Sequence, residues 1–166
     1  MSGKPAARLG DKVTHALPPL LGPGPGSPDV LIGYLPAWRG VPAGTAAKLK
    51  KAKDLSDKVI QTAEKASAAA KGTPAAPAAV VAENATKLAA AAQMSSMINS
   101  MAGGADIHLC ITLLPPIPHG PGVVIDGSKT VLINGLPACR QGDTVLEAIG
   151  PPNKINKGEQ TVLIGD

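Results

Sequence analysis

Three histidines and a cysteine are the residues of this sequence with the clearest capacity for chemistry: His15, His108, Cys110 and His119. None lies in the alanine- and lysine-rich stretch from 44 to 102. Imidazole nitrogen and thiolate sulfur are the usual ligands of tetrahedral zinc. His108 and Cys110 are two positions apart, which on a strand puts both side chains on one face. The four lack the paired Cys-x-x-Cys spacing of a zinc finger, so by themselves they leave ordinary packing or surface roles open.

Composition limits the fold that can position these residues. A chain of 166 residues has room for one domain, or for a small domain with an insertion. It contains no Phe, one Trp and one Tyr, so any core must be aliphatic. Gly (19) and Pro (17) are abundant, but apolar segments recur in a fixed pattern, which indicates tight turns and not disorder.

The net charge and the first residues of the chain indicate which binding partners and which cellular compartment to expect. The net charge is +4, and the lysines concentrate between 48 and 71, where they form one solvated helix face. Without aromatic residues or a dense arginine cluster, this stripe is not typical of a nucleic-acid binder. Residues 1–5 begin no apolar signal-peptide core, so we expect synthesis in the cytoplasm without general export. In a reducing compartment the two cysteines are thiols or metal ligands.

An internal repeat organises the sequence outside the stretch from 44 to 102. A turn followed by a short Val-Leu-Ile strand occurs three times, at 26–33, 127–134 and 158–165. A further segment with strand-like alternation precedes each, at 10–15, 105–110 and 142–147. A Pro-Ala-x-Arg corner also occurs three times, at 5–8, 36–39 and 137–140.

These short strand pairs cannot each bury a face alone, so we expect them to close around a shared axis with pseudo-threefold symmetry. His15 and Cys110 occupy matching places, four residues after Asp11 and Asp106. A threefold arrangement directs both side chains towards one point on the axis. The third copy has Glu147 at the matching place.

The segment Pro5-Ala6-Ala7-Arg8-Leu9-Gly10-Asp11, the repeated Val-Leu-Ile strands and the segment 116–120 resemble the PAAR-repeat family. The resemblance covers about 1–43 and 103–166. It implies a small cone that tips the trimeric valine-glycine-repeat spike of a type VI secretion system, or of a related injection particle. It also implies recruitment of effectors, and export as part of the injected spike.

The resemblance also implies one structural zinc ion per chain, because the family places a metal-binding histidine at the position of His119. The ligand set we predict is His15, His108, Cys110 and His119. Glu147 and Cys139 are less favoured, since Glu147 replaces a cysteine frequent in the family and Cys139 occupies a small position of a corner, where a packed thiol is expected. We predict no catalytic residue.

The stretch from 44 to 102 interrupts the repeat and has helical periodicity. Thr45 can cap a first helix that the segment 72–74 ends, and a second helix begins near Pro77. The predicted seam of the first helix is Leu49, Ala52, Leu55, Val59, Ala63, Ala66 and Ala70. The predicted seam of the second is Val81, Ala85, Leu88, Ala92, Ser95, Ile98 and Met101. We therefore expect a mostly β, pseudo-threefold cone formed by 1–43 and 103–166, with an antiparallel helical hairpin inserted at 44–102.

Two other functions stay open from the sequence. The first is a small zinc hydrolase in which Glu147 acts as general base. The second assigns the activity to the hairpin, as a docking surface for an effector, an adaptor or a membrane. The second helix is made of small and polar residues and falls short of the leucine-rich run that membrane insertion demands. Since the sequence ends inside the third repeat, we expect any cargo to be a separate chain.

Overall fold

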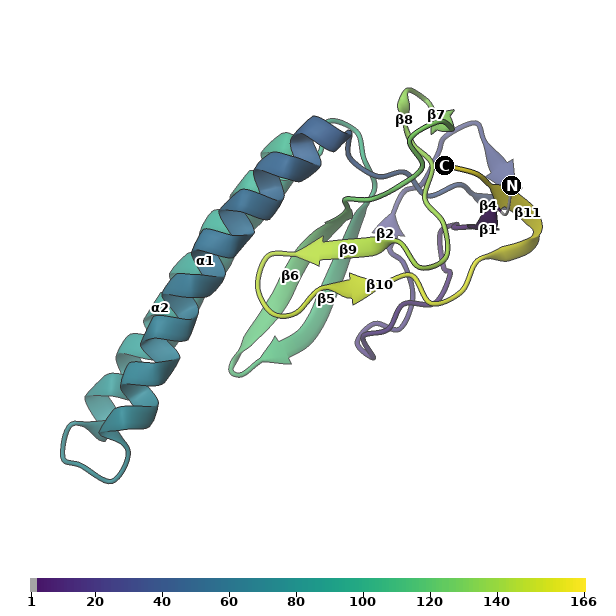
Figure 1. Ribbon diagram of the computed structural model, residues 1–166. Helices are drawn as coiled ribbons and strands as arrows, with labels where there is room; N and C mark the ends of the chain where they lie inside the picture. The colour runs from purple at the N-terminus through teal and green to yellow at the C-terminus, as the bar shows by residue number, and fades with distance from the viewer. Residues whose placement is uncertain (1–2) are drawn as a thin grey trace.

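The computed structural model describes residues 3–166; Met1 and Ser2, with which the predicted cone begins, lie outside the described residues. A strand-rich body carries one long helical hairpin (Figure 1). The fold class predicted from the repeats, a β cone with inserted helices, is confirmed. The elements are β1 (Lys4–Ala6), β2 (Pro23–Gly24), β3 (Leu31–Ile32), β4 (Leu35–Pro36), α1 (Ala43–Ala70), α2 (Ala76–Met101), β5 (Ile107–Leu114), β6 (Ile117–Val124), β7 (Leu132–Ile133), β8 (Leu136–Pro137), β9 (Thr144–Glu147), β10 (Asn153–Lys154) and β11 (Glu159–Ile164).

Each Val-Leu-Ile segment forms an antiparallel pair with the proline strand of a corner. In the first two copies this partner follows directly in sequence, as β4 follows β3 and β8 follows β7. The third copy, β11, pairs with β1 instead, so the two ends of the chain complete the third unit together. The matching pairs are Leu31 with Pro36, Leu132 with Pro137, and Leu163 with Pro5.

A closed ring of backbone hydrogen bonds joins the three corners. The amide of Trp38 donates to the carbonyl of Ala7 (2.9 Å), and the amide of Cys139 donates to the carbonyl of Trp38 (3.0 Å). The amide of Ala7 donates to the carbonyl of Cys139 (2.9 Å) and completes the circle. The pseudo-threefold axis expected from the repeats therefore passes through this ring.

Small and aliphatic side chains fill the space around the axis, as the composition requires. One cluster contains an alanine and an isoleucine from every copy: Ala6, Ala37, Ala138, Ile32, Ile133 and Ile164. The neighbouring cluster holds the single tryptophan, Trp38, which is buried against Leu21, Val145 and Ile155. One indole thus supplies the bulk that the missing phenylalanines would otherwise provide.

The corner arginines bind aspartates in the same way in all three copies. In each copy one carboxylate oxygen accepts the arginine backbone amide at 2.8 Å and also faces its Nε. Two of the pairs are three residues apart, whereas the third joins residues 67 positions apart, because the helical hairpin is inserted between its partners. The pairs are Arg8 with Asp11, Arg39 with Asp106, and Arg140 with Asp143.

A five-stranded antiparallel sheet in the order β10-β9-β6-β5-β2 extends from the corners. In its register Cys110 faces Gly120, and Glu147 faces Gly122. The predicted strand at 10–15 is not a regular strand, since its pairing is limited to isolated bridges. Proline-rich chain follows it directly and provides few amides for a ladder.

The observed start of the first helix differs from the predicted one. Helix α1 begins after Pro42, whose carbonyl accepts the amide of Ala46 at 2.9 Å. The predicted cap at Thr45 is wrong, because Thr45 already lies inside the helix. The end is as expected: α1 stops at Ala70, and Gly72 adopts a positive φ of 80°.

The predicted seams of the two helices are largely wrong. Leu55 and Val59 are 57% and 58% exposed, and Val81 and Leu88 are 68% and 60% exposed. Each helix packs on the cone as well as on the other helix, and an alanine-rich sequence has no unique apolar stripe that could indicate both contacts. The buried residues are Ala46, Leu49, Lys53 and Ile60 in α1, and Lys87, Ala90, Ala91, Met94 and Ile98 in α2. Among residues 3–166 no helix combines the length and apolarity needed to cross a membrane.

The Arg39–Asp106 pair provides a test of the fold. The Asp106 carboxylate is fully buried and accepts hydrogen bonds from the Gly26 amide and from Arg39. Asp106→Ala leaves the Arg39 guanidinium buried without its counter-ion, so we expect the free energy of unfolding to fall by about 3–5 kcal/mol. Urea denaturation measures this, with Asp54→Ala on an exposed face of α1 as control. A loss below about 1 kcal/mol would show that the pair is dispensable.

Candidate metal centre

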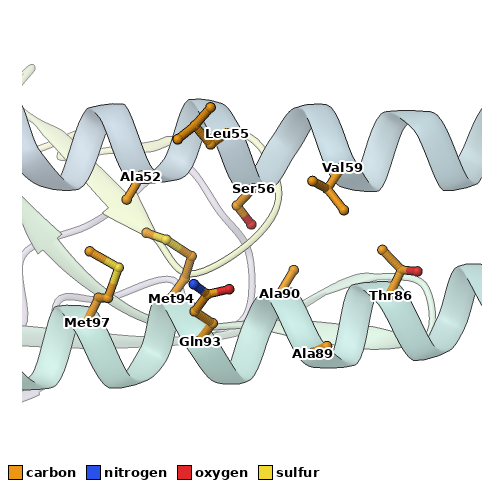
Figure 2. A pocket seen from close by; sticks show the side chains of 10 residues that line it. All are labelled: Ala52, Leu55, Ser56, Val59, Thr86, Ala89, Ala90, Gln93, Met94 and Met97. Atoms are coloured by element: carbon orange, nitrogen blue, oxygen red, sulfur yellow. The ribbon is translucent and has the colours of Figure 1, made fainter.

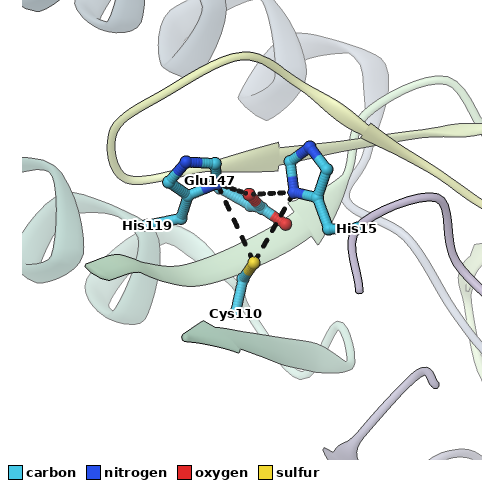
Figure 3. Close-up of side chains that lie close together, drawn as sticks. All are labelled: His15, Cys110, His119 and Glu147. Atoms are coloured by element: carbon cyan, nitrogen blue, oxygen red, sulfur yellow. Dashed lines mark hydrogen bonds and ion pairs between the residues drawn. The ribbon is translucent and has the colours of Figure 1, made fainter. Parts of the chain in front are cut away.

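Four potential ligands converge beside the paired strands β5 and β6 (Figure 3). His15, Cys110 and Glu147 come from the matching positions of the three copies, four residues after the corner aspartates. His119 is the fourth member and comes from β6. One ligand atom from each residue lies within 4.8 Å of those of the other three. The axis inferred from the repeats is therefore where the side chains meet.

The distances inside the cluster are those of a compact polar contact. Cys110 Sγ lies 3.6 Å from His15 Nδ1 and 3.8 Å from His119 Nδ1. Glu147 Oε2 lies 3.1 Å from His15 Nδ1 and 2.7 Å from His119 Nδ1. In a tetrahedral site with metal–nitrogen bonds of about 2.0 Å and metal–sulfur bonds of about 2.3 Å, neighbouring ligand atoms are about 3.3–3.7 Å apart. The four donors therefore fit around a single ion with small movements.

The backbone holds each ligand in place. Cys110 and His119 lie on the paired strands β5 and β6, and Glu147 ends β9 beside them. The amide of His15 donates to Asn153 Oδ1 at 2.9 Å. Behind the ring of His119 the chain turns at Gly150, where an added Cβ would lie 2.4 Å from His119 Nε2. Only glycine leaves room for the imidazole there.

Burial sets the protonation of the cluster. Cys110 and Glu147 are fully buried, and His119 is 2% exposed. Burial lowers the pKa of His119 to about 4 and raises the pKa of Glu147 to about 7. Burial also raises the pKa of the Cys110 thiol and lowers the pKa of His15. Both imidazoles are therefore neutral at pH 7, which is the form that binds metals.

His108, the remaining predicted ligand, lies beside the cluster but outside it. It is fully buried, and its Nε2 is 4.0 Å from Glu147 Oε1. Neither ring nitrogen has a hydrogen-bond partner within the described chain. His108 stands two residues after its corner aspartate, where the other copies have Val13 and Val145. The structure thus brings together three of the four predicted ligands and adds Glu147, which the sequence had placed lower.

Cys139, the other less favoured candidate, lies in the ring of corners and not in the cluster. Its thiol is completely buried, and burial raises its pKa well above the usual range. Its Sγ approaches the carbonyl of Pro137 at 3.9 Å. This thiol packs in the core next to Trp38.

Asn153 is a residue of the site that the sequence did not indicate. It is fully buried, and its Nδ2 donates to Glu147 Oε1 at 3.0 Å while its Oδ1 accepts the amide of His15. The side chain therefore fixes both the Glu147 carboxylate and the backbone at His15. Asn153 begins the two-residue strand β10, which is outside the repeated pattern, so nothing in its spacing distinguished it.

Comparison with known families agrees with the repeat analysis. Residues 116–166 match the model of the PAAR motif. The matched region includes His119 and Glu147, whereas His15 and Cys110 precede it. No curated protein and no solved structure is significantly similar to the chain.

Metal content tests the cluster directly. We expect the wild-type chain to retain one divalent metal ion per molecule, measured by plasma mass spectrometry after exhaustive dialysis. His15→Ala, Cys110→Ala and His119→Ala each remove a donor, and we expect each to lose most of the metal. Cys139→Ala is the matched control, because it removes a buried thiol outside the cluster. Full metal content in the three variants would contradict the site.

A second pair of variants tests whether Glu147 or His108 is the fourth ligand. His108→Val introduces the residue found at both matching positions, and we expect it to keep the metal. Glu147→Gln removes a charged oxygen donor, and we expect it to weaken binding by about tenfold or more. Competition with a fluorescent metal indicator measures both affinities. The opposite result would make His108 the ligand and Glu147 its neighbour.

The pH dependence of metal binding follows from the raised pKa values. Metal binding displaces a proton from the Cys110 thiol and, below pH about 7, a second proton from Glu147. The apparent affinity therefore falls as the pH falls, by about tenfold per pH unit above pH 7 and by about a hundredfold per unit between about pH 5 and 7. Indicator competition over this range measures the slope. In Glu147→Gln we expect the apparent affinity to fall by about tenfold per pH unit below pH 7 as well as above it, because only the Cys110 proton is displaced. An affinity that does not change with pH would contradict the proton release.

Proposed function

We propose that this chain, which carries a PAAR motif and is consistent with a PAAR-repeat protein, is the tip of a bacterial contractile injection machine. In this proposal its cone, stapled by zinc, caps a trimeric valine-glycine-repeat spike of the type VI secretion kind. The chain is made in the cytoplasm, leaves as part of the injected spike and helps to recruit effectors that are separate chains.

One observation carries the proposal: a threefold set of exposed leucines. Leu31, Leu132 and Leu163 are the central leucines of the three Val-Leu-Ile segments, and they are 61%, 59% and 60% exposed. Their strands gather at the end of the molecule that also holds both termini (Figure 1). A threefold-symmetric partner presents the same surface three times, so this end can make three equivalent apolar contacts with it.

The chemistry of the metal centre supports zinc as the bound ion. Two imidazoles, a thiolate and one carboxylate are donors that tetrahedral zinc accepts. The cone has a small, aromatic-poor core, and a structural metal can supply the folding free energy that such a core lacks. A zinc ion that joins β5, β6, β9 and the segment of His15 would make this part of the cone rigid.

The burial of Glu147 supports a structural site over a hydrolytic one. A catalytic zinc keeps an open position for water and needs a nearby general base. Glu147, the base that a hydrolase would require, is fully buried and lies among the ligands. The proposal therefore assigns no catalytic role to any residue.

Spike binding tests the proposal. We expect the wild-type chain to bind a trimeric valine-glycine-repeat spike protein of the source bacterium in biolayer interferometry. Each of Leu31→Asp, Leu132→Asp and Leu163→Asp should weaken binding by about tenfold or more, because a charge replaces a buried apolar contact. Leu109→Asp is the control, since this leucine is 45% exposed on β5. Binding that survives the triple variant would refute the proposed interface.

A further inference from the structure

An open apolar groove runs between the two helices of the inserted hairpin (Figure 2). Leu55 and Val59 of α1 form one wall, and Met94 and Met97 of α2 form the other with Ala90. The groove encloses about 390 Å³. The ribbons of the cone lie behind the helices in this view, so the groove opens on the side away from the cone.

The groove leaves apolar surface uncovered at its centre. Leu55 and Val59 are 57% and 58% exposed although they are the bulkiest apolar residues that α1 contributes to the groove. Ser56 lies between them, and its buried Oγ has no hydrogen-bond partner among residues 3–166. Two paired helices offer such a groove to a third helix, which completes a bundle by packing along both.

The α1 edge of the groove is positively charged. Lys48, Lys51 and Lys58 are exposed and stand seven residues before, four before and three after Leu55, which places them on the same stripe of the helix. The neighbouring acidic residues point elsewhere: Asp57 binds Lys53, and Asp54 lines a separate pocket beside β9. None of these three lysines forms an ion pair with a carboxylate among residues 3–166, so this edge carries three unpaired cations.

The α2 edge is neutral. The groove residues on this side include Ala89, Gln93 and Thr86. The charged residues of α2 are Glu83 and Lys87, which bind one another at 2.6 Å, and Lys87 also binds Glu64 of α1 at 3.0 Å. The groove thus has an apolar floor, a basic edge and a neutral edge.

We propose that this groove binds an amphipathic helix of a separate protein, whose apolar face covers Leu55, Val59 and Met97 and whose acidic residues face the α1 lysines. The α2 part of the groove extends from Thr86 to Met97, a length of about 18 Å, so about three turns of the partner helix fit. The hairpin alone determines this interaction, so it holds whether or not the cone caps a spike.

The charge pattern selects an acidic partner over a second copy of this chain. The exposed stripe of α1 is basic and α2 offers no free carboxylate, so another hairpin has no acidic edge to place against Lys48, Lys51 and Lys58. A concave groove also suits a single helix better than a flat lipid surface, because its apolar residues lie between two ridges.

Two designed helical peptides test the proposal on the full-length protein. Both are about 20 residues long and share the same leucines at i, i+4 and i+7, but one carries glutamates along the edge of the apolar face and the other carries lysines. In fluorescence anisotropy at low salt we expect the glutamate peptide to bind about tenfold more tightly or better, and the difference to shrink as salt rises.

Matched variants assign the binding to the groove. Leu55→Asp should weaken binding of the glutamate peptide by about tenfold. Leu88→Asp changes a residue that is 60% exposed outside the groove, and it should leave this binding unchanged. Lys48→Glu, Lys51→Glu and Lys58→Glu combined should reverse the preference between the peptides. Helix content and spike binding of each variant, measured beside it, report folding and the cone interface separately.

Three outcomes would overturn the proposal. The first is equal binding of the two peptides, or binding that Leu55→Asp does not change. The second is binding to vesicles of anionic phospholipid that depends on Leu55 while the glutamate peptide does not bind. The third is a dimer in analytical ultracentrifugation that Leu55→Asp dissociates, which would make the groove a contact between copies of this chain.

Discussion

The hydrogen-bonded ring of Ala7, Trp38 and Cys139 is the constraint on which the rest of the cone depends. One chain must pass the same axis three times, and each pass is locked to the next by one backbone bond. The aspartate that binds each corner arginine then fixes the direction in which the chain leaves the ring. Because that direction is the same in all three copies, the residue four positions after each aspartate lies at the axis. The convergence of the candidate metal ligands therefore depends on the ring.

The Arg39–Asp106 pair explains how the cone accommodates 67 positions of chain where its other copies need three. The entropy of closing a loop grows slowly with its length, so a buried ion pair can hold the two ends of the insertion together. The hairpin also contributes contacts of its own. Lys53 Nζ donates to the carbonyl of Gly150 at 2.9 Å, and Lys87 Nζ donates to the carbonyl of Pro115 at 3.2 Å. Gly150 lies against the ring of His119, and Pro115 lies in the β5–β6 turn, so the insertion supports both of these turns.

The sequence predicted the features that the repeat encodes and missed those that depend on contacts between elements. Matching positions in the repeats directed His15 and Cys110 towards one axis and gave Glu147 as the equivalent residue of the third copy. Spacing alone did not favour Glu147 over His108 as the fourth ligand, because both side chains are buried and they lie only 4.0 Å apart. The pairing of β11 with β1 joins the two ends of the chain, and the exposure of Leu55 depends on how the hairpin leans on the cone. Neither contact leaves a periodic signal in an alanine-rich or proline-rich segment.

A threefold axis supplies three equivalent donor positions, whereas a tetrahedral ion needs four, so one copy must break the symmetry. The second copy does so with β5 and β6, whose eight residues each make them the longest strands of the described chain. The extra length carries His119 back to the axis opposite Cys110. The helical hairpin is inserted in this same copy, and α2 packs along β6. The insertion therefore lies behind the one ligand that the symmetry does not provide, where Gly150, held by Lys53, limits the movement of the His119 ring.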